Sequence, residues 1–156
     1  MVVIAVGAVT IGTGMIYLNR FNSWQRLESV REETISNLRL AQNYAKTRQA
    51  PMGSSDNLVY VEVRVISDNL IAGINGVGTT YFSQKLVNTG IGISLNPSVL
   101  YYWGGSGQLA TTTGGSLYGA SDTATVVIRS TKETVGYDIL SISALGSITS
   151  GAYVAE

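Results

Sequence analysis

The sequence contains no cysteine and no histidine among its 156 residues. Without cysteine the chain has no disulfide, no thiolate metal site, no iron–sulfur cluster and no cysteine nucleophile. Without histidine it also lacks the commonest general base, the serine–histidine–aspartate triad and the usual zinc ligand. We therefore expect a protein that is not an enzyme and that holds no metal ion and no other cofactor.

Charged residues are also scarce, at 13% of the chain, which is about half of what is usual in soluble domains. Ten basic residues balance ten acidic ones. Affinity for phosphate is built from clustered lysine and arginine, so we expect no nucleic-acid partner. Residues 1–18 carry no charge at all, residues 19–48 carry six basic and three acidic groups, and residues 49–156 carry four basic and seven acidic groups. The chain is therefore divided into three regions.

The uncharged region, residues 1–18, is rich in valine and isoleucine and is hydrophobic on all sides of a helix. A helix of this length extends roughly 27 Å, just short of the hydrocarbon core of a bilayer. We interpret it as a transmembrane helix, with a buried core helix and a cleaved signal peptide as alternatives. The signal peptide fits poorly, because no basic region precedes the apolar run.

From residue 19 to residue 50 the pattern changes to that of an amphipathic helix, with apolar residues three or four positions apart. We expect these residues to pack on the rest of the protein: Trp24, Leu27, Ile35, Leu38, Ala41 and Ala45. No proline or glycine interrupts residues 15–50, so one helix of about 45 residues is predicted. Pro51 and Gly53 then end the helix, which divides the chain into a helix, 1–50, and a head, 51–156.

The head has the alternation and the turn residues of β-strands. Asn75-Gly76 is a strong hairpin signal, and residues 143–146 are expected to turn the last hairpin. The expected strands are 58–66, 70–74, 77–82, 85–87, 91–95, 99–103, 124–129, 137–143 and 147–149. Residues 104–121 are expected to be a loop or an edge strand. The predicted fold class is α+β, a long N-terminal helix whose second half packs on a head of antiparallel sheet.

Three consecutive aromatic residues, Tyr101, Tyr102 and Trp103, have two interpretations. They are a candidate contact surface for a sugar or another surface. The alternative, which we favour, is a strand that buries one of its aromatic faces.

Residues 1–7, MVVIAVG, resemble the interior of the type IV pilin N-terminal signature, G-F-T-L-I-E-h-h-V-V-I-A, where h is apolar. Residues 34–51 resemble the helix end of minor pilins and of type II secretion pseudopilins of the H-like group, where L-x-x-A-x-x-x-A precedes the head. Here that pattern is formed by Leu38, Ala41 and Ala45. Residues 139–148 are similar to that group's last hairpin.

The extreme N-terminal signature is missing, because the family's prepilin-peptidase site and its glutamate would lie upstream of Met1. Three explanations are open: a gene that starts further upstream, a truncated chain, or a variant that assembles without the glutamate. We favour the first. The positions of Arg20, Arg26 and Arg31 also favour a start further upstream. By the positive-inside rule these arginines place the head in the cytoplasm unless a basic leader precedes the helix.

The resemblance implies a structural subunit of a bacterial type IV pilus or type II secretion pseudopilus. Such a subunit is held in the inner membrane by its apolar helix and then polymerises with copies of itself or with other pilins into an extracellular or periplasmic filament. The residues expected in the membrane and then in the filament core are Val2, Val3, Ile4, Val6, Val9 and Ile11. Gly7, Gly12 and Gly14 weaken the helix by about 1 kcal/mol each, so we expect local unwinding there. The alternative function is a membrane-anchored binding or adhesion module that never polymerises and uses residues 97–121 for contact.

Overall fold

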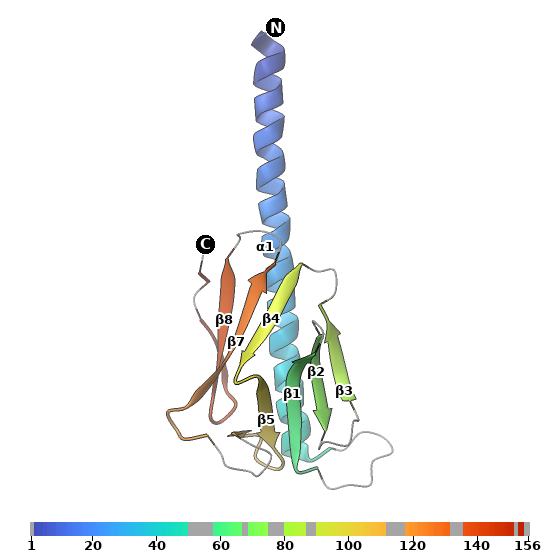
Figure 1. Ribbon diagram of the computed structural model, residues 1–156, viewed down its shortest axis with the longest axis vertical. Helices are drawn as coiled ribbons and strands as arrows, with labels where there is room; N and C mark the ends of the chain where they lie inside the picture. Colours follow the sequence, from blue (N-terminus) through green and yellow to red (C-terminus); the bar gives the residue numbers. More distant parts are fainter. Residues whose placement is uncertain are drawn as a thin grey trace.

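The computed structural model is one long helix joined to a head of two antiparallel sheets (Figure 1). This is the α+β fold that the sequence predicts. The structure describes residues 2–49, 58–66, 69–74, 80–86, 90–111, 118–131, 136–151 and 153–154, with side chains for all of these except 2–16, 69 and 71–74. The predicted joint at Pro51 and the predicted turn at Asn75-Gly76 lie outside the described residues.

Helix α1 runs without interruption from Val2 to Thr47, over 46 residues (Figure 1). Its length confirms the single helix of about 45 residues expected from the sequence. The helix ends where Arg48 adopts a left-handed backbone, with φ of 49°. The carbonyl oxygen of Ala45 accepts two hydrogen bonds at this end, from the N–H of Arg48 at 3.1 Å and from the N–H of Gly105 in the head at 2.8 Å. The head therefore caps the helix that it packs against.

The first sheet has five strands in the order β3-β2-β1-β5-β6. Their bounds are β1 Tyr60–Ile66, β2 Asn69–Ile74, β3 Thr80–Lys85, β5 Val99–Trp103 and β6 Leu109–Ala110. The second sheet has four strands in the order β4-β7-β8-β9. Their bounds are β4 Ile91–Asn96, β7 Thr123–Ser130, β8 Tyr137–Ser143 and β9 Ile148–Ser150. Every pairing in both sheets is antiparallel.

One predicted strand is wrong. Where the sequence predicted strands over 77–82 and 85–87, the structure has β3, which pairs with β2 up to the register Asn69↔Lys85. Leu86 follows this last pair and is buried outside any strand, so its apolar character reflects packing rather than sheet pairing. The predicted last hairpin is confirmed, since Gly146 turns with φ of 78° and donates a 2.7 Å hydrogen bond to Ser143.

The core lies between the second half of α1 and the inward faces of both sheets. Alternate strand positions point inward, as the period of two requires. The buried strand residues include Val61, Val63, Leu100, Tyr102, Ala124, Val126, Ile128, Leu140 and Ile142. Helix residues Ala41 and Ala45 are completely buried, and their small side chains let the backbone of α1 approach the sheets. The first half of α1 extends beyond the head (Figure 1).

Candidate functional site

The second half of α1 forms an extensive seam with the head. Five of the six residues predicted to pack there are buried: Leu27, Ile35, Leu38, Ala41 and Ala45. The sixth, Trp24, is different, because 46% of its surface is exposed. The centroids of the Trp24 and Tyr153 rings are 6.5 Å apart, and the ring planes are inclined at 75°, which is an edge-to-face arrangement. Trp24 therefore lies at the upper boundary of the seam rather than inside it, because there the sheets no longer cover the helix.

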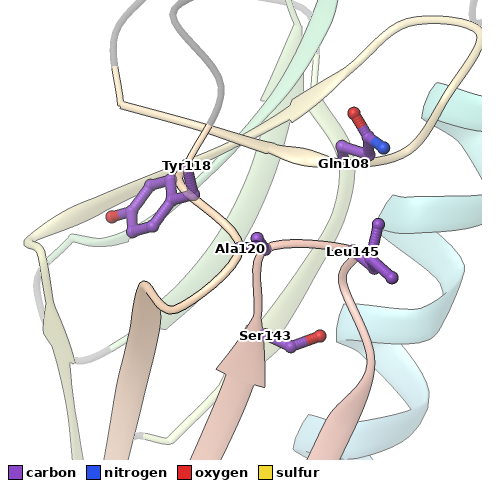
Figure 2. A pocket seen from close by; sticks show the side chains of 6 residues that line it. Gln108, Tyr118, Ala120, Ser143 and Leu145 are labelled. Atoms are coloured by element: carbon purple, nitrogen blue, oxygen red, sulfur yellow. The ribbon is translucent and has the colours of Figure 1, made fainter.

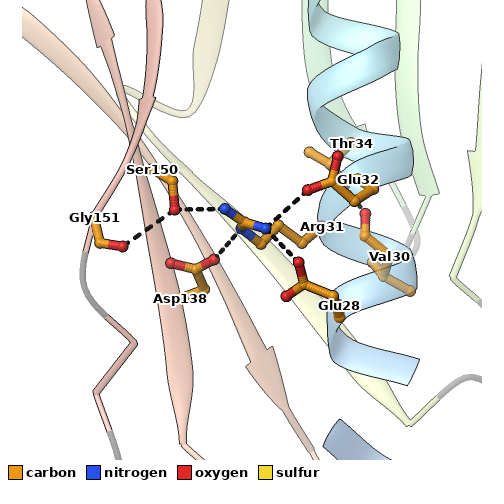
Figure 3. Close-up of polar contacts among 8 residues, drawn as sticks. All are labelled: Glu28, Val30, Arg31, Glu32, Thr34, Asp138, Ser150 and Gly151. Atoms are coloured by element: carbon orange, nitrogen blue, oxygen red, sulfur yellow. Dashed lines mark hydrogen bonds and ion pairs between the residues drawn. The ribbon is translucent and has the colours of Figure 1, made fainter. Parts of the chain in front are cut away.

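The seam is fastened by Arg31, whose guanidinium reaches from α1 into the second sheet (Figure 3). Its Nε lies 2.5 Å from Oδ2 of Asp138 on β8, close in distance although not aligned as a hydrogen bond. Its Nη1 donates to Glu28 at 2.5 Å and to Glu32 at 2.8 Å. Its Nη2 donates to the hydroxyl of Ser150 on β9 at 2.7 Å. One side chain thus connects the helix to two neighbouring strands.

This ion pair is largely removed from water, because the side chain of Arg31 is 18% exposed and that of Asp138 is 6% exposed. The Oδ1 atom of Asp138 has no hydrogen-bond partner among the described residues. Asp138 is not among the site residues predicted from the sequence. The alternation of β8 could have indicated its burial, because Asp138 shares the inward positions with Leu140 and Ile142. A carboxylate at such a position needs a cation opposite it.

A second polar contact fixes the other end of the seam. The side-chain amide of Gln42 is buried and donates to the carbonyl oxygens of Gly107, at 3.1 Å, and Leu145, at 3.0 Å. A Cβ atom built at Gly146 would lie 2.1 Å from Nε2 of Gln42. The glycine is therefore needed for close approach to the helix as well as for its positive φ.

Above the head, α1 exposes four large apolar side chains, which we call the collar. The exposed fractions are 75% for Tyr17, 61% for Leu18, 57% for Phe21 and 46% for Trp24. Tyr17, Phe21 and Trp24 are four and three residues apart, so they share one side of the helix, and Leu18 is three residues before Phe21. The collar is an apolar and aromatic surface that the head leaves largely uncovered, apart from the contact between Trp24 and Tyr153.

The structure removes Tyr102 from the candidate contact surface at residues 101–103. Tyr102 points inward and is completely buried, and its hydroxyl has no partner among the described residues. Burial raises the pKa of the Tyr102 hydroxyl well above its ordinary value. Tyr101 and Trp103 lie on the opposite face of β5 and are half-buried, and Tyr101 packs its ring against Tyr60 at 5.4 Å and 84°. β5 thus buries one aromatic face, at Tyr102, and a contact role for Tyr101 and Trp103 stays a prediction.

A pocket of about 310 Å³ lies beside the turn of the last hairpin (Figure 2). It is lined by Gln108, Tyr118, Ala120, Ser143, Ala144 and Leu145. Burial, with a smaller contribution from the charge of Asp122, raises the pKa of Tyr118. The volume of the pocket is at the lower end of the range for small-molecule pockets. Three of the lining residues, Gln108, Tyr118 and Ala120, belong to the region 97–121 that the sequence predicts as the contact region of the alternative function.

Among the described residues, no group of three or more acidic, histidine or cysteine side chains is placed to hold a metal ion. Over that same part of the chain, no helical stretch has both the length and the apolar character needed to cross a bilayer. The side chains of residues 2–16 lie outside the described part. The roles predicted for Val2, Val3, Ile4, Val6, Val9 and Ile11, and for Gly7, Gly12 and Gly14, therefore stay predictions.

No protein-family profile matches the sequence, and no curated protein matches it. The fold, however, is similar to crystal structures of the type IV minor pilin FimU of Pseudomonas aeruginosa. One structure has a TM-score of 0.60 at 17% identity and covers 85% of this chain and 92% of that chain. A second crystal form has a TM-score of 0.57 at 16% identity and covers 80% of this chain and 92% of that chain. The chain therefore has a type IV pilin-like fold, as its resemblance to that family implied.

Proposed function

We propose that this protein is a structural subunit of a type IV pilus and that it assembles through the first half of α1. The observation that carries the proposal is the division of one continuous helix into two halves. The head buries the second half, whereas the first half extends beyond it with its collar uncovered (Figure 1). An apolar rod of this kind needs a bilayer or other helices around it.

The partners in this proposal are other copies of the chain or other pilins, and the subunit is held in the bacterial inner membrane before assembly. The likeness to a minor pilin supports a pilus rather than a type II secretion pseudopilus. A structural role also agrees with the chemistry of the chain, which has no histidine and no cysteine. Its buried charged contact, between Arg31 and Asp138, connects the helix to the head.

The test is electron microscopy of surface material sheared from cells that produce the full chain, with antibodies to the head as label. We expect labelled filaments from the unaltered chain. A Val9→Asp variant places a carboxylate in the apolar segment, at a cost of about 2.5–3.5 kcal/mol in a bilayer centre. It should abolish the filaments while the head keeps its circular dichroism spectrum and its thermal unfolding midpoint.

The matched control is Asn43→Asp, which adds the same charge to the same helix at an exposed position beside the head. Filaments should persist in this variant. Unlabelled filaments, or filaments unaffected by Val9→Asp, would contradict the proposed route of assembly.

The second candidate is a membrane-anchored binding module that does not polymerise. The pocket beside the last hairpin favours it, because Gln108, Tyr118 and Ala120 lie within the region 97–121 (Figure 2). This function requires that detergent extracts the chain as monomers and that no labelled filament is found. The same microscopy therefore separates the two candidates.

A further inference from the structure

The head leaves most of the collar uncovered. The four side chains of the collar are between 46% and 75% exposed, although each is large and apolar. The collar meets the head at Trp24, through the ring contact with Tyr153. Aromatic and aliphatic surface of this extent on one helix is costly to leave in water, so it marks a place where something else covers the protein.

The position of the collar indicates what covers it. It begins at the end of the uncharged segment 1–18 and continues for two turns, from Tyr17 to Trp24. Along the helix axis this is about 10 Å, comparable with the headgroup zone of about 5–8 Å on each side of a bilayer. Tyrosine and tryptophan are enriched in this zone because each has an apolar ring and a polar tip.

The charges around the collar point to the same environment. Residues 1–27 contain no acidic side chain and two arginines, Arg20 and Arg26, which are both exposed. Acidic residues begin at Glu28, at the level where the head starts to cover the helix. An aromatic surface with neighbouring arginines and no carboxylates complements the phosphates of anionic lipids. Two collars packed against each other would instead bring these arginines together.

We propose that the collar is a membrane-interface anchor, which holds Trp24 and its neighbours among the headgroups of anionic phospholipids and so fixes how far the head stands from the bilayer. This inference rests on the proposed function, because the collar meets lipid only while the subunit is held in a membrane. Leaving the membrane for a filament then requires the collar to give up its lipid contacts.

The chain provides a direct test, because it has two tryptophans, one in the collar and one in the head. A Trp103→Phe variant of the full chain keeps Trp24 as its only tryptophan. We would reconstitute it into vesicles of phosphatidylcholine and phosphatidylglycerol that carry bromine either near the headgroup end or near the tail end of the acyl chain. Bromine near the headgroups should quench Trp24 at least about twofold more than bromine near the tails.

The matched control is Trp24→Phe, which keeps Trp103 on β5, at the end of the head remote from the projecting helix (Figure 1). Bromine at either depth should leave Trp103 unquenched. Equal quenching of the two tryptophans, no quenching of Trp24, or stronger quenching of Trp24 from the tails would overturn the proposal. So would failure of the full chain to float with the vesicles.

The role of the two arginines is tested with separate variants. Replacing Arg20 and Arg26 together by glutamine should remove the dependence of Trp24 quenching on phosphatidylglycerol, whereas Arg39→Gln, an exposed arginine beside the head, should not. If Trp24 is instead shielded without lipid, to a degree that rises with protein concentration, a second copy covers the collar and the proposal fails. Filament microscopy is read separately, so an anchor without filaments refutes only the proposed function, and filaments without an anchor refute only this inference.

Discussion

The two halves of α1 belong to one uninterrupted helix, yet they have opposite environments. In the second half, Leu38, Ala41 and Ala45 are completely buried against the sheets. In the first half, the collar residues Tyr17 and Phe21 are more than half exposed, although each side chain has a larger apolar surface than alanine. Hydrophobicity alone therefore does not determine burial along α1, because an apolar side chain is buried only where the head reaches it.

The polar residues show the same division. Beside the head, Arg31 is paired with Asp138 and Glu28, and the side-chain amide of Gln42 donates hydrogen bonds to two backbone carbonyl oxygens. Along the collar, Arg20 and Arg26 are exposed. The second half is thus specified by contacts within the chain, whereas the first half is adapted to an environment outside it.

The largest effect should come from the most buried leucine of the helix. Leu38→Ala should lower the free energy of unfolding by about 3 kcal/mol, because it leaves a cavity between α1 and the sheets. Leu18→Ala, the same change in the collar, should alter it by less than about 0.5 kcal/mol. Urea unfolding of the full chain in mild detergent, followed by circular dichroism, measures both. Equal losses would mean that the head covers the collar in solution.

An intermediate effect is expected at the ion pair that joins the helix to the second sheet. Asp138→Asn should cost about 2 kcal/mol, because it leaves the largely buried guanidinium of Arg31 facing a neutral group. The matched variant Glu32→Gln, whose carboxylate side chain is 64% exposed, should cost less than about 0.5 kcal/mol. The same urea unfolding distinguishes them. A loss below about 0.5 kcal/mol for Asp138→Asn would show that the pair adds nothing to the seam.

The smallest effect at neutral pH, and a clear one in alkali, is expected from Tyr102→Phe in the core that α1 covers. The hydroxyl of Tyr102 has no partner among the described residues, so its loss should change stability by no more than about 1 kcal/mol. Burial raises the pKa of Tyr102 in the folded protein above its ordinary value of 10.0. Above about pH 10 the unfolded chain therefore binds fewer protons than the folded one, and stability falls as the pH rises.

Unfolding midpoints measured on both sides of pH 10 should therefore diverge, with Tyr102→Phe losing less stability in alkali than the unaltered chain. Some alkaline loss should remain in the variant, because burial, with a smaller contribution from Tyr44, raises the pKa of Tyr81 to about 12. Parallel pH curves for the two proteins would contradict the enclosed position of Tyr102.

Much of the fold could be predicted from local patterns. The absence of proline and glycine over residues 15–47 predicted the continuous helix, because nothing in that stretch breaks the hydrogen-bond ladder. Alternation predicted β1, β7 and β8, and Gly146 predicted the last turn. The error over 85–87 arose because Leu86 is apolar for packing, which a short window cannot distinguish from a strand.

The sequence by itself determined the elements, the lack of histidine and cysteine chemistry, and which residues share a face, because periodicity and composition are local properties. Only the tertiary structure decided that Arg31 meets Asp138, 107 residues away in the chain and on another element, and that Tyr102 rather than Tyr101 is enclosed. It also decided where the head stops along α1, and hence that Trp24 belongs to the collar. The reason is physical: apolar side chains occur along the whole of α1, and only the elements packed against the helix determine which of them are withdrawn from water.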